Sequence, residues 1–501
     1  MNDKKYLKWY QKLAYGSGDL ASNCSYGLVS SFLLLYLSDV MGLKTNIIGT
    51  LMLVSKVFDG VTDVFFGNMI DKTKSRLGKA RPWMLYAQIG VSLCLVLLFS
   101  IPNMGQTAQY AYFFAFYTCL NAIFYTANGV AYSTLSALIT NNPQERVQLG
   151  SIRFMFAVVT NIVMGFAVTG GVEAFGGGAA GWRAVAIICA LIGLVVNTIS
   201  CLAVKEVEPD ESVRKIDESK PQDDKLGFWE SMKFLFTNKY YVLILVLYIV
   251  YYIMSNITTG SGVYFTKYVL GDASLLGMFQ MMKMFPVIIA LIFTPMLVKK
   301  TGSMQKVNFW GYAINCVLSV FFIYFAYQKN VKLMLLFMFI KGIFAGTLSG
   351  TLNALIAEIS GYTYRTRGVR MDGTMFSCSS LGIKIGGGIG TAAVGWLLDL
   401  GGYVGKAVEQ TSGALNMIFA MYIVIPVILS DFTLFFSFYN LSTILAYETI
   451  FIIKSLRGGV ILHALLLSGG DSLYLISIFL IHDIRIYEPQ SGMSLTAFAG
   501  M

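Results

Sequence analysis

Apolar runs of about 20 residues recur along nearly the whole chain, and no other feature of the sequence constrains its fold as strongly. A helix of that length crosses the hydrocarbon core of a bilayer. Six runs precede residue 205 and six follow residue 237, near 14–38, 46–70, 83–102, 109–138, 150–171, 183–204, 238–260, 274–298, 307–327, 332–357, 374–398 and 414–437. The sequence therefore predicts an all-α polytopic membrane protein with twelve transmembrane helices in two six-helix halves.

Composition supports a membrane protein and argues against other classes. Of 501 residues, 56% are hydrophobic and 13% are charged, which is too apolar for a soluble protein of this size. The net charge of +10 does not indicate a nucleic-acid partner, because the basic residues lie in short loops between apolar runs. All seven cysteines stand singly in apolar runs, so we expect neither a disulfide nor a zinc site, and no cofactor.

The charge pattern divides the chain and orients it. The segment 205–225 is highly charged and can neither span a membrane nor form a core, so it predicts a linker between the halves. Basic loops, such as 71–82, alternate with nearly neutral ones, and the positive-inside rule then places the N-terminus in the cytoplasm of a multi-pass protein of the cytoplasmic (inner) membrane. No removable signal peptide is expected. We expect four parts: an N-terminal half 1–204, a cytoplasmic linker 205–236, a C-terminal half 237–438 and an atypical apolar tail 439–501 that is either an added span or a reading-frame change.

The two halves repeat each other in sequence. The segment from Lys56, KVFDGVTDVFFGNMIDKTKS, aligns without gaps with KMFPVIIALIFTPMLVKKTG from Lys283. Asp59 and Asp63 of the first copy align with Pro286 and Ala290 of the second, so the carboxylates are confined to the N-terminal half. Parallel repeats of this kind are typical of transporters that bind their substrate near the membrane midplane between the halves.

Lys56, Asp59 and Asp63 are three ionisable residues within one apolar run, at spacings that place them on one helical face. Each charge near a helix centre costs roughly 2.5 to 3.5 kcal/mol on insertion scales. We therefore predict a cation or substrate site, although a neutralised set that only holds helices together is the alternative. Two carboxylates one turn apart repel each other unless a cation, a proton or a lysine lies between them.

Four further charges lie in predicted spans, and each marks a functional-site hypothesis. Asp19 is flanked by small residues that let a ligand or another helix approach. Lys384 needs a counterion, for which Asp59 or Asp63 across the interface between the halves is the natural choice. Arg153 lies nearer the cytoplasmic end, where gating, snorkelling and ligand contact are all open. Lys283 is the fourth of these charges.

The fourth predicted span carries polar and aromatic side chains at helical spacing: Tyr125, Thr126, Asn128 and Tyr132. Hydroxyl groups, amides and ring faces together suit a sugar, although the same pattern is also common in packing. Both histidines, His463 and His482, lie in the tail, and no nucleophile elbow is present. We therefore expect a transporter and not an enzyme. An intramembrane enzyme and a carrier of amphipathic lipids are the rival hypotheses.

Several long motifs resemble the glycoside-pentoside-hexuronide:cation symporter family of the major facilitator superfamily. They are LYLSDVMGLK (35–44), KVFDGVTDVFFGNMIDKTKSRLGKARPW (56–83), YFTKYVLGD (264–272) and RTRGVRMDGTMFSCSSLGIK (365–384). The resemblance implies uptake of a small sugar substrate with a monovalent cation, either Na+, Li+ or H+. It further implies residue roles, which are cation binding by Asp59, Asp63 and Thr126, substrate binding by Asp19, Asn128, Tyr132 and Lys384, and coupling or gating by Lys56 and Arg153.

One departure from the family pattern concerns specificity. The melibiose permease of this family has a second sugar-holding aspartate on its fourth helix, and ungapped alignment places Gly129 there. A nearby tryptophan of that permease aligns with Ser133. These differences argue against assuming galactoside specificity. The identity of the sugar stays open, as does the choice between Na+ and H+, with a slight preference for Na+.

Overall fold

The computed structural model describes residues 6–140, 142–207, 236–302, 304–367, 372–407 and 409–430. Most of the predicted linker and all of the predicted tail 439–501 lie outside these residues. The domain boundaries therefore stay a prediction.

Six helical segments make up the N-terminal half, and two of them contain more than one helical element. The first combines α1 (Trp9–Gly16), α2 (Gly18–Leu35) and the π-helical η1 (Tyr36–Val40), and the fourth combines α5 (Gln106–Thr118), η2 (Cys119–Tyr125) and α6 (Thr126–Leu138). The others are α3 (Thr45–Lys72), α4 (Arg81–Leu98), α7 (Pro143–Ala174) and α8 (Gly178–Leu202).

The C-terminal half repeats this plan with six further segments. They are α11 (Lys239–Tyr264) with η4 (Phe265–Val269), α12 (Leu275–Thr301), α13 (Met304–Tyr327), α14 (Val331–Arg367), α15 (Asp372–Leu400), and α16 (Ser412–Phe419) with η5 (Ala420–Val424). The described residues contain no strand. The predicted all-α fold of two six-helix halves is confirmed.

Helix boundaries follow local chemistry. Pro82 lies in the first turn of α4, where its missing N–H costs nothing. The side chain of Asn238 accepts a hydrogen bond from the Tyr240 backbone at the start of α11. Gly302 ends α12 with a positive φ of 72°, a conformation that glycine adopts at little cost.

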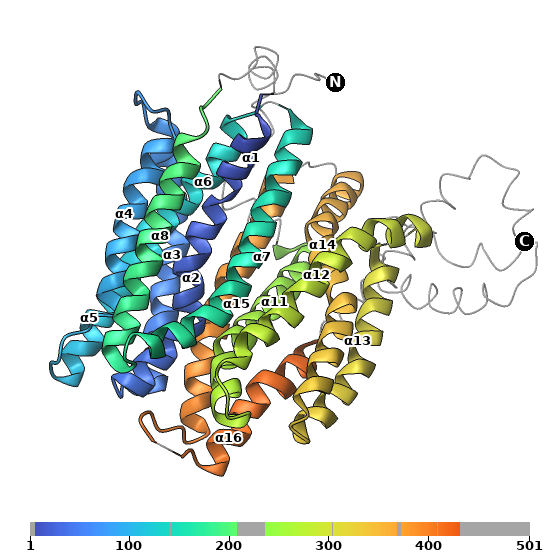
Figure 1. Ribbon diagram of the computed structural model, residues 1–501. Coiled ribbons are helices and arrows are strands. Elements are labelled where there is room, and N and C mark those ends of the chain that lie inside the picture. Colours follow the sequence, from blue (N-terminus) through green and yellow to red (C-terminus); the bar gives the residue numbers. More distant parts are fainter. Residues whose placement is uncertain are drawn as a thin grey trace, which may run out of the picture. The chain divides into compact units, whose positions relative to one another are not determined.

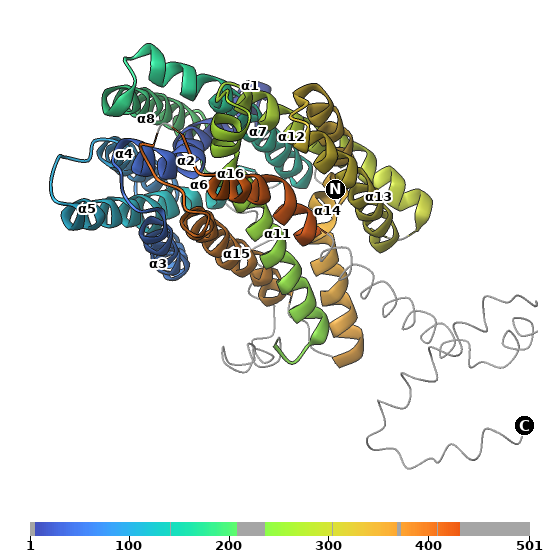
Figure 2. The ribbon, with the colours of Figure 1, turned by 90° about the horizontal axis from the view of Figure 1, so that it is seen from below.

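Three helix pairs join the halves, and Figures 1 and 2 show their arrangement: α2 with α11, α3 with α15, and α7 with α12. Glycines permit the close approach. A Cβ at Gly49 of α3 would lie 2.7 Å from the Ala392 carbonyl oxygen of α15, and one at Gly165 of α7 would lie 2.9 Å from the Gly277 Cα of α12. Small residues at such contacts are typical of helix packing within membranes.

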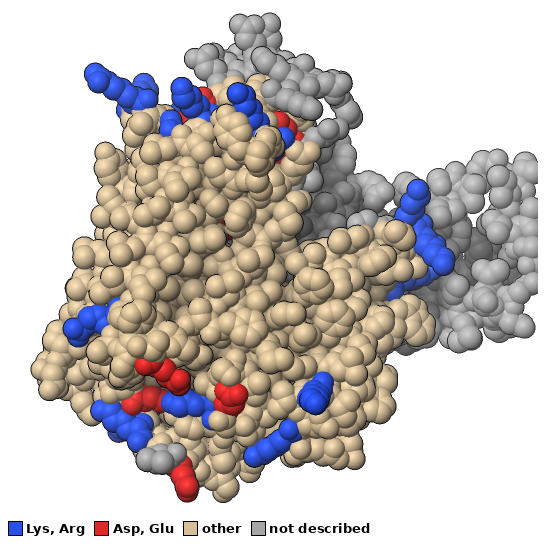
Figure 3. All heavy atoms as spheres, in the orientation of Figure 1, with Lys and Arg blue, Asp and Glu red and all other residues tan. Residues whose placement is uncertain are grey.

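The sides of the bundle are apolar. Nine of the described helical segments are long and apolar enough to cross a membrane. Large apolar side chains stay exposed on them, including Leu93 at 60%, Val317 at 61% and Ile292 at 66%. Figure 3 shows that charged side chains gather towards the two ends on the face it displays, with an almost uncharged surface between them. The protein is therefore a multi-pass membrane protein.

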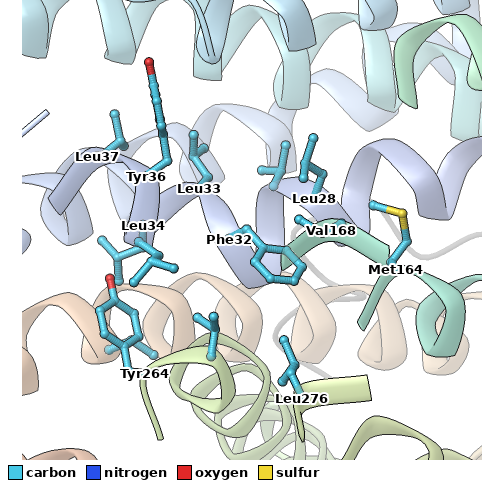
Figure 4. Packing of buried hydrophobic residues seen from close by; sticks show 14 of the residues in the cluster. Leu28, Phe32, Leu33, Leu34, Tyr36, Leu37, Met164, Val168, Tyr264 and Leu276 are labelled. Atoms are coloured by element: carbon cyan, nitrogen blue, oxygen red, sulfur yellow. The ribbon is translucent and has the colours of Figure 1, made fainter. Parts of the chain in front are cut away.

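A buried apolar cluster ties α2 to both halves at one end of the bundle. Figure 4 shows Phe32 of α2 with Met164 and Val168 of α7, Tyr264 of α11 and Leu276 of α12. Phe32 and Tyr264 are fully buried. This packing fixes the N-terminal half against the C-terminal half beside the cavity described next.

Candidate functional site

A cavity of about 720 Å³ lies between the two halves. Helices of both halves line it, which is the position that the sequence repeat predicts. The polar lining residues are Asn23, Tyr26, Ser30, Lys56, Asp59, Asp63, Tyr125, Thr126, Ser133, Thr134, Asn161, Tyr252, Ser255, Asn256, Thr258, Thr259, Gln280, Lys283, Lys384 and Tyr422.

The carboxylates of α3 form the charged centre of this cavity together with two lysines. Lys56 Nζ lies 3.4 Å from Asp59 Oδ2. Lys384 reaches across from α15 and forms an ion pair with Asp63. Its Nζ also lies 2.7 Å from the backbone oxygen of Asp59 and 3.9 Å from Asp59 Oδ1. The prediction that Lys384 finds its counterion on this helix is confirmed.

Thr126 completes this cluster from α6. Its hydroxyl donates to Asp59 Oδ1 at 2.5 Å. The same Oγ1 lies 2.8 Å from the backbone oxygen of Asn121. Asp59 and Thr126 therefore offer neighbouring oxygen atoms, and Asp63 lines the same cavity; carboxylate and hydroxyl oxygens are ligands that hard cations accept.

Asp19, Arg153 and Tyr132 form a separate cluster. Arg153 Nε lies 2.6 Å from Asp19 Oδ2, and its guanidinium lies 4.0 Å from the centre of the Tyr132 ring. The Tyr132 hydroxyl donates to the backbone oxygen of Tyr15 at 2.8 Å. None of the three lines the cavity in this conformation. Asp19, which is predicted to bind sugar, instead forms an ion pair with Arg153.

The structure does not bring Asn128 to the cavity either. Thr126, Gly129 and Ser133 share one face of the fourth helical segment, and that face lines the cavity. Asn128 lies on the opposite face, is 2% exposed, and donates to Gln88 Oε1 at 2.9 Å. The substrate-binding roles of Asn128 and Tyr132 stay predictions that this conformation does not support.

Comparison with known proteins assigns the family. Residues 14–443 match the family described as MFS/sugar transport protein. The chain belongs to this family. It is 30% identical over 431 residues to the isoprimeverose transporter of Lactiplantibacillus pentosus, covering 85% of this chain and 87% of that protein. It is 25% identical to the glucuronide carrier protein homolog of Escherichia coli strain K12, covering 80% and 86% respectively.

The resemblance to the glycoside-pentoside-hexuronide:cation symporter family is thereby confirmed. A solved structure supports the fold independently of sequence. The D-xylose-proton symporter superposes with a TM-score of 0.57 at 13% identity, covering 85% of this chain and 97% of that one. The transporter therefore has the major facilitator fold.

Several lining residues of the transporter escaped the sequence analysis. Asn161 Nδ2 of α7 donates to Asn23 Oδ1 of α2 at 3.0 Å. The rings of Tyr26 and Tyr125 stack with centroids 5.6 Å apart. Asn23 lies four residues and Tyr26 seven residues after Asp19, so helical periodicity from Asp19 could have found them.

A second polar cluster closes one end of the interface between the halves. Asp39 of η1 accepts from Lys267 Nζ and from the Tyr268 hydroxyl of η4, each at 2.5 Å, and also from the Tyr403 hydroxyl. Ser38 Oγ lies 3.1 Å from the Tyr264 hydroxyl. We call Asp39, Lys267, Tyr268 and Tyr403 the end cluster. Asp39 and Lys267 lie in corresponding π-helical turns of the first and seventh spans, and both belong to motifs quoted from the sequence, LYLSDVMGLK and YFTKYVLGD.

Proposed function

We propose that the transporter imports a glycoside, pentoside or hexuronide together with Na+ or H+, by alternating access between its two halves. The observation that carries this proposal is the pair Asp59 and Asp63 in the wall of the cavity, neutralised by Lys384 from the opposite half. The printed names of the relatives, an isoprimeverose transporter and a glucuronide carrier homolog, support a sugar as cargo.

The Lys384 ammonium lies beside Asp59 and Asp63, at the position that a coupling cation would take. Two neighbouring carboxylates cannot stay charged and empty at low cost, and a lysine ammonium neutralises them when no ion is bound. A Na+ ion held by Asp59, Asp63 and Thr126, or a proton on either carboxylate, would release Lys384 into the cavity. Ion binding would thus change a contact between the halves, which is how one ligand can alter the affinity for another.

Asp19 and Arg153 fit a gating step. Arg153 engages Asp19 Oδ2 in this conformation, so this oxygen becomes free for sugar hydroxyls when the ion pair breaks. We propose that movement of the cytoplasmic ends of the helices breaks this pair. Asn23 and Tyr26, one and two turns after Asp19 on α2, and Asn161 of α7 line the cavity and can bind the remaining hydroxyls.

The end cluster defines the direction in which this conformation faces. Under the positive-inside rule the N-terminus is cytoplasmic, so the cluster lies at the outer end of the first and seventh spans. The described contacts between the halves run from this end to Lys384. We propose that the structure is closed to the outside, with the cavity served from the cytoplasm, and that the protein resides in the cytoplasmic membrane.

Gradient-driven uptake tests this function. The protein is reconstituted into vesicles, a Na+ or H+ gradient is imposed, and accumulation of radiolabelled glycosides, pentosides and hexuronides is followed. We expect uphill accumulation of at least one sugar with one gradient, and its collapse when an ionophore removes that gradient. Protein-free vesicles are the control. Sugar-independent lipid transfer, or turnover of a substrate without any gradient, would overturn the proposal.

A further inference from the structure

Lys283 is the third lysine of the cavity, and it lies apart from the carboxylates. It projects from α12 into the lining, and its Nζ lies 3.4 Å from the hydroxyl oxygen of Thr259. A hydroxyl can accept a hydrogen bond but neutralises no charge. The ion pairs of the other two lysines go to Asp59 and Asp63, and within the described part of the chain none joins Lys283.

The sequence repeat explains why no described residue pairs with this lysine as a counterion. Lys56, at the matching position of the first half, has Asp59 one turn further along its helix. Lys283 is followed at the corresponding positions by Pro286 and Ala290. The neighbouring α14 packs against this stretch through Gly342 and Gly346, and its sequence has no acidic residue from 331 to 357.

The charge balance of the cavity is therefore positive on its C-terminal side. Among the described lining residues there are three lysines against two carboxylates, and binding of a coupling cation to Asp59 and Asp63 would add one more positive charge. An uncompensated ammonium inside a membrane protein is costly, and such residues typically meet an anionic partner or mark a substrate path.

The neighbours of Lys283 suit the other groups of a sugar. Gln280 lies one turn before it on α12, and Asn256 and Thr259 face the same cavity from α11. Amide and hydroxyl groups beside an ammonium can bind ring hydroxyls and a carboxylate together. We propose that Lys283 holds the carboxylate of an anionic sugar and that the preferred substrate is a hexuronide glycoside. This inference rests on the proposed function and selects among its substrates.

Binding of three matched ligands to the purified full chain tests the inference: 4-nitrophenyl β-glucuronide, its methyl ester and 4-nitrophenyl β-glucoside. They differ mainly in the charge at C6. We expect the wild type to bind the glucuronide about 10- to 100-fold more tightly than the two neutral ligands, the range that one charge-assisted hydrogen bond supplies. The variant Lys283→Gln should lose this preference, whereas Lys283→Arg should retain it.

Lys341→Gln is the matched control, because Lys341 lies on α14 with its ammonium 5.0 Å from the Phe322 ring centre and does not line the cavity. It should bind all three ligands as the wild type does. Equal affinities for charged and neutral ligands in the wild type, or an unchanged preference in Lys283→Gln, would overturn the inference. Gradient-driven uptake of the glucoside would show in that case that the proposed symport still holds. Absence of gradient-driven uptake of every sugar would instead refute the proposed function itself.

Discussion

At the scale of single residues, Asp63 is the more accessible of the two carboxylates, with a side chain that is 36% exposed against 14% for Asp59. Asp63 is therefore the better placed to exchange Lys384 for an ion from the cavity. Asp59 is held by Thr126, Lys56 and the backbone contact with Lys384. The two aspartates thus differ in their surroundings although the sequence places them one turn apart.

Substitution of Asp63 should separate ion binding from sugar binding. We expect Asp63→Cys to abolish the ion stimulation of sugar affinity, which for coupled sites is typically about 5- to 150-fold, while basal binding persists. Titration of a bound sugar with and without Na+, at two pH values, measures this. Asp19→Ala, by contrast, should weaken sugar binding itself under all four conditions. If the Asp63 variant kept full ion stimulation, Asp59 and Asp63 would have a structural role and would not bind the coupling ion.

Lys384 and Asp63 should show energetic coupling. Lys384→Ala leaves the carboxylate without its partner, so we expect weaker coupled uptake and a lower unfolding temperature. Adding Asp63→Ala removes the stranded charge, and the double variant should recover about 1 kcal/mol relative to the sum of the single changes. Thermal unfolding of the four proteins in detergent gives this cycle. If the losses of stability in the two single variants simply added up in the double variant, Lys384 and Asp63 would not be energetically coupled.

At the scale of elements, Glu145 near the start of α7 anchors the N-terminus of the chain. Its carboxylate accepts from the backbone N–H groups of Tyr6 and Leu7 and from Thr140, and pairs with Lys12 at 3.0 Å. Burial raises the pKa of Glu145, but the hydrogen bonds from Thr140, Lys12, Tyr6 and Leu7 outweigh it and lower the pKa below its ordinary 4.5. The contact therefore stabilises the folded state when the carboxyl is ionised.

This anchor should make stability depend on acid pH. Because the folded-state pKa is lowered, its contribution is fully present above about pH 4.5 and is lost as the pH falls through the folded-state value. We expect the unfolding temperature of the wild type to fall more steeply between pH 6 and pH 3 than that of Glu145→Gln. Identical slopes in the two proteins would show that the anchor contributes nothing to acid sensitivity.

At the scale of the whole molecule, the end cluster and the Lys384 contacts hold one arrangement of the two halves. Asp39 receives hydrogen bonds from η4 and from Tyr403, all in the C-terminal half. Loss of these bonds favours any arrangement in which this end is open, because the bonds exist only while it is closed. A single substitution in the end cluster should therefore change the relative populations of the closed and open arrangements.

Asp39→Asn should open this end of the molecule. Ser38 is fully buried here, so a Ser38→Cys reporter reacts slowly with a membrane-impermeant maleimide. Loss of the charged hydrogen bonds should raise the labelling rate about tenfold, in keeping with roughly 1.5 to 3 kcal/mol for such a bond. Asp272→Asn is the control, because Asp272 bonds within its own loop to Ser274. Labelling that is equal in both variants would exclude a gating role for the cluster.

The sequence alone determined the membrane class, the two six-helix halves and the presence of two carboxylates within one span, because apolar length and the cost of buried charge are local properties. It also predicted the Lys384 pair, since an ammonium in a span needs an anion and Asp59 and Asp63 lie within an apolar run of the other half. Tertiary structure decided how each helix is turned about its axis. That rotation points Asn128 away from the cavity, joins Asp19 to Arg153 across 134 residues, sets Asp39 against Lys267 and leaves Lys283 facing the cavity. Helical periodicity specifies which residues share a face, and only packing against the neighbouring helices specifies where that face points.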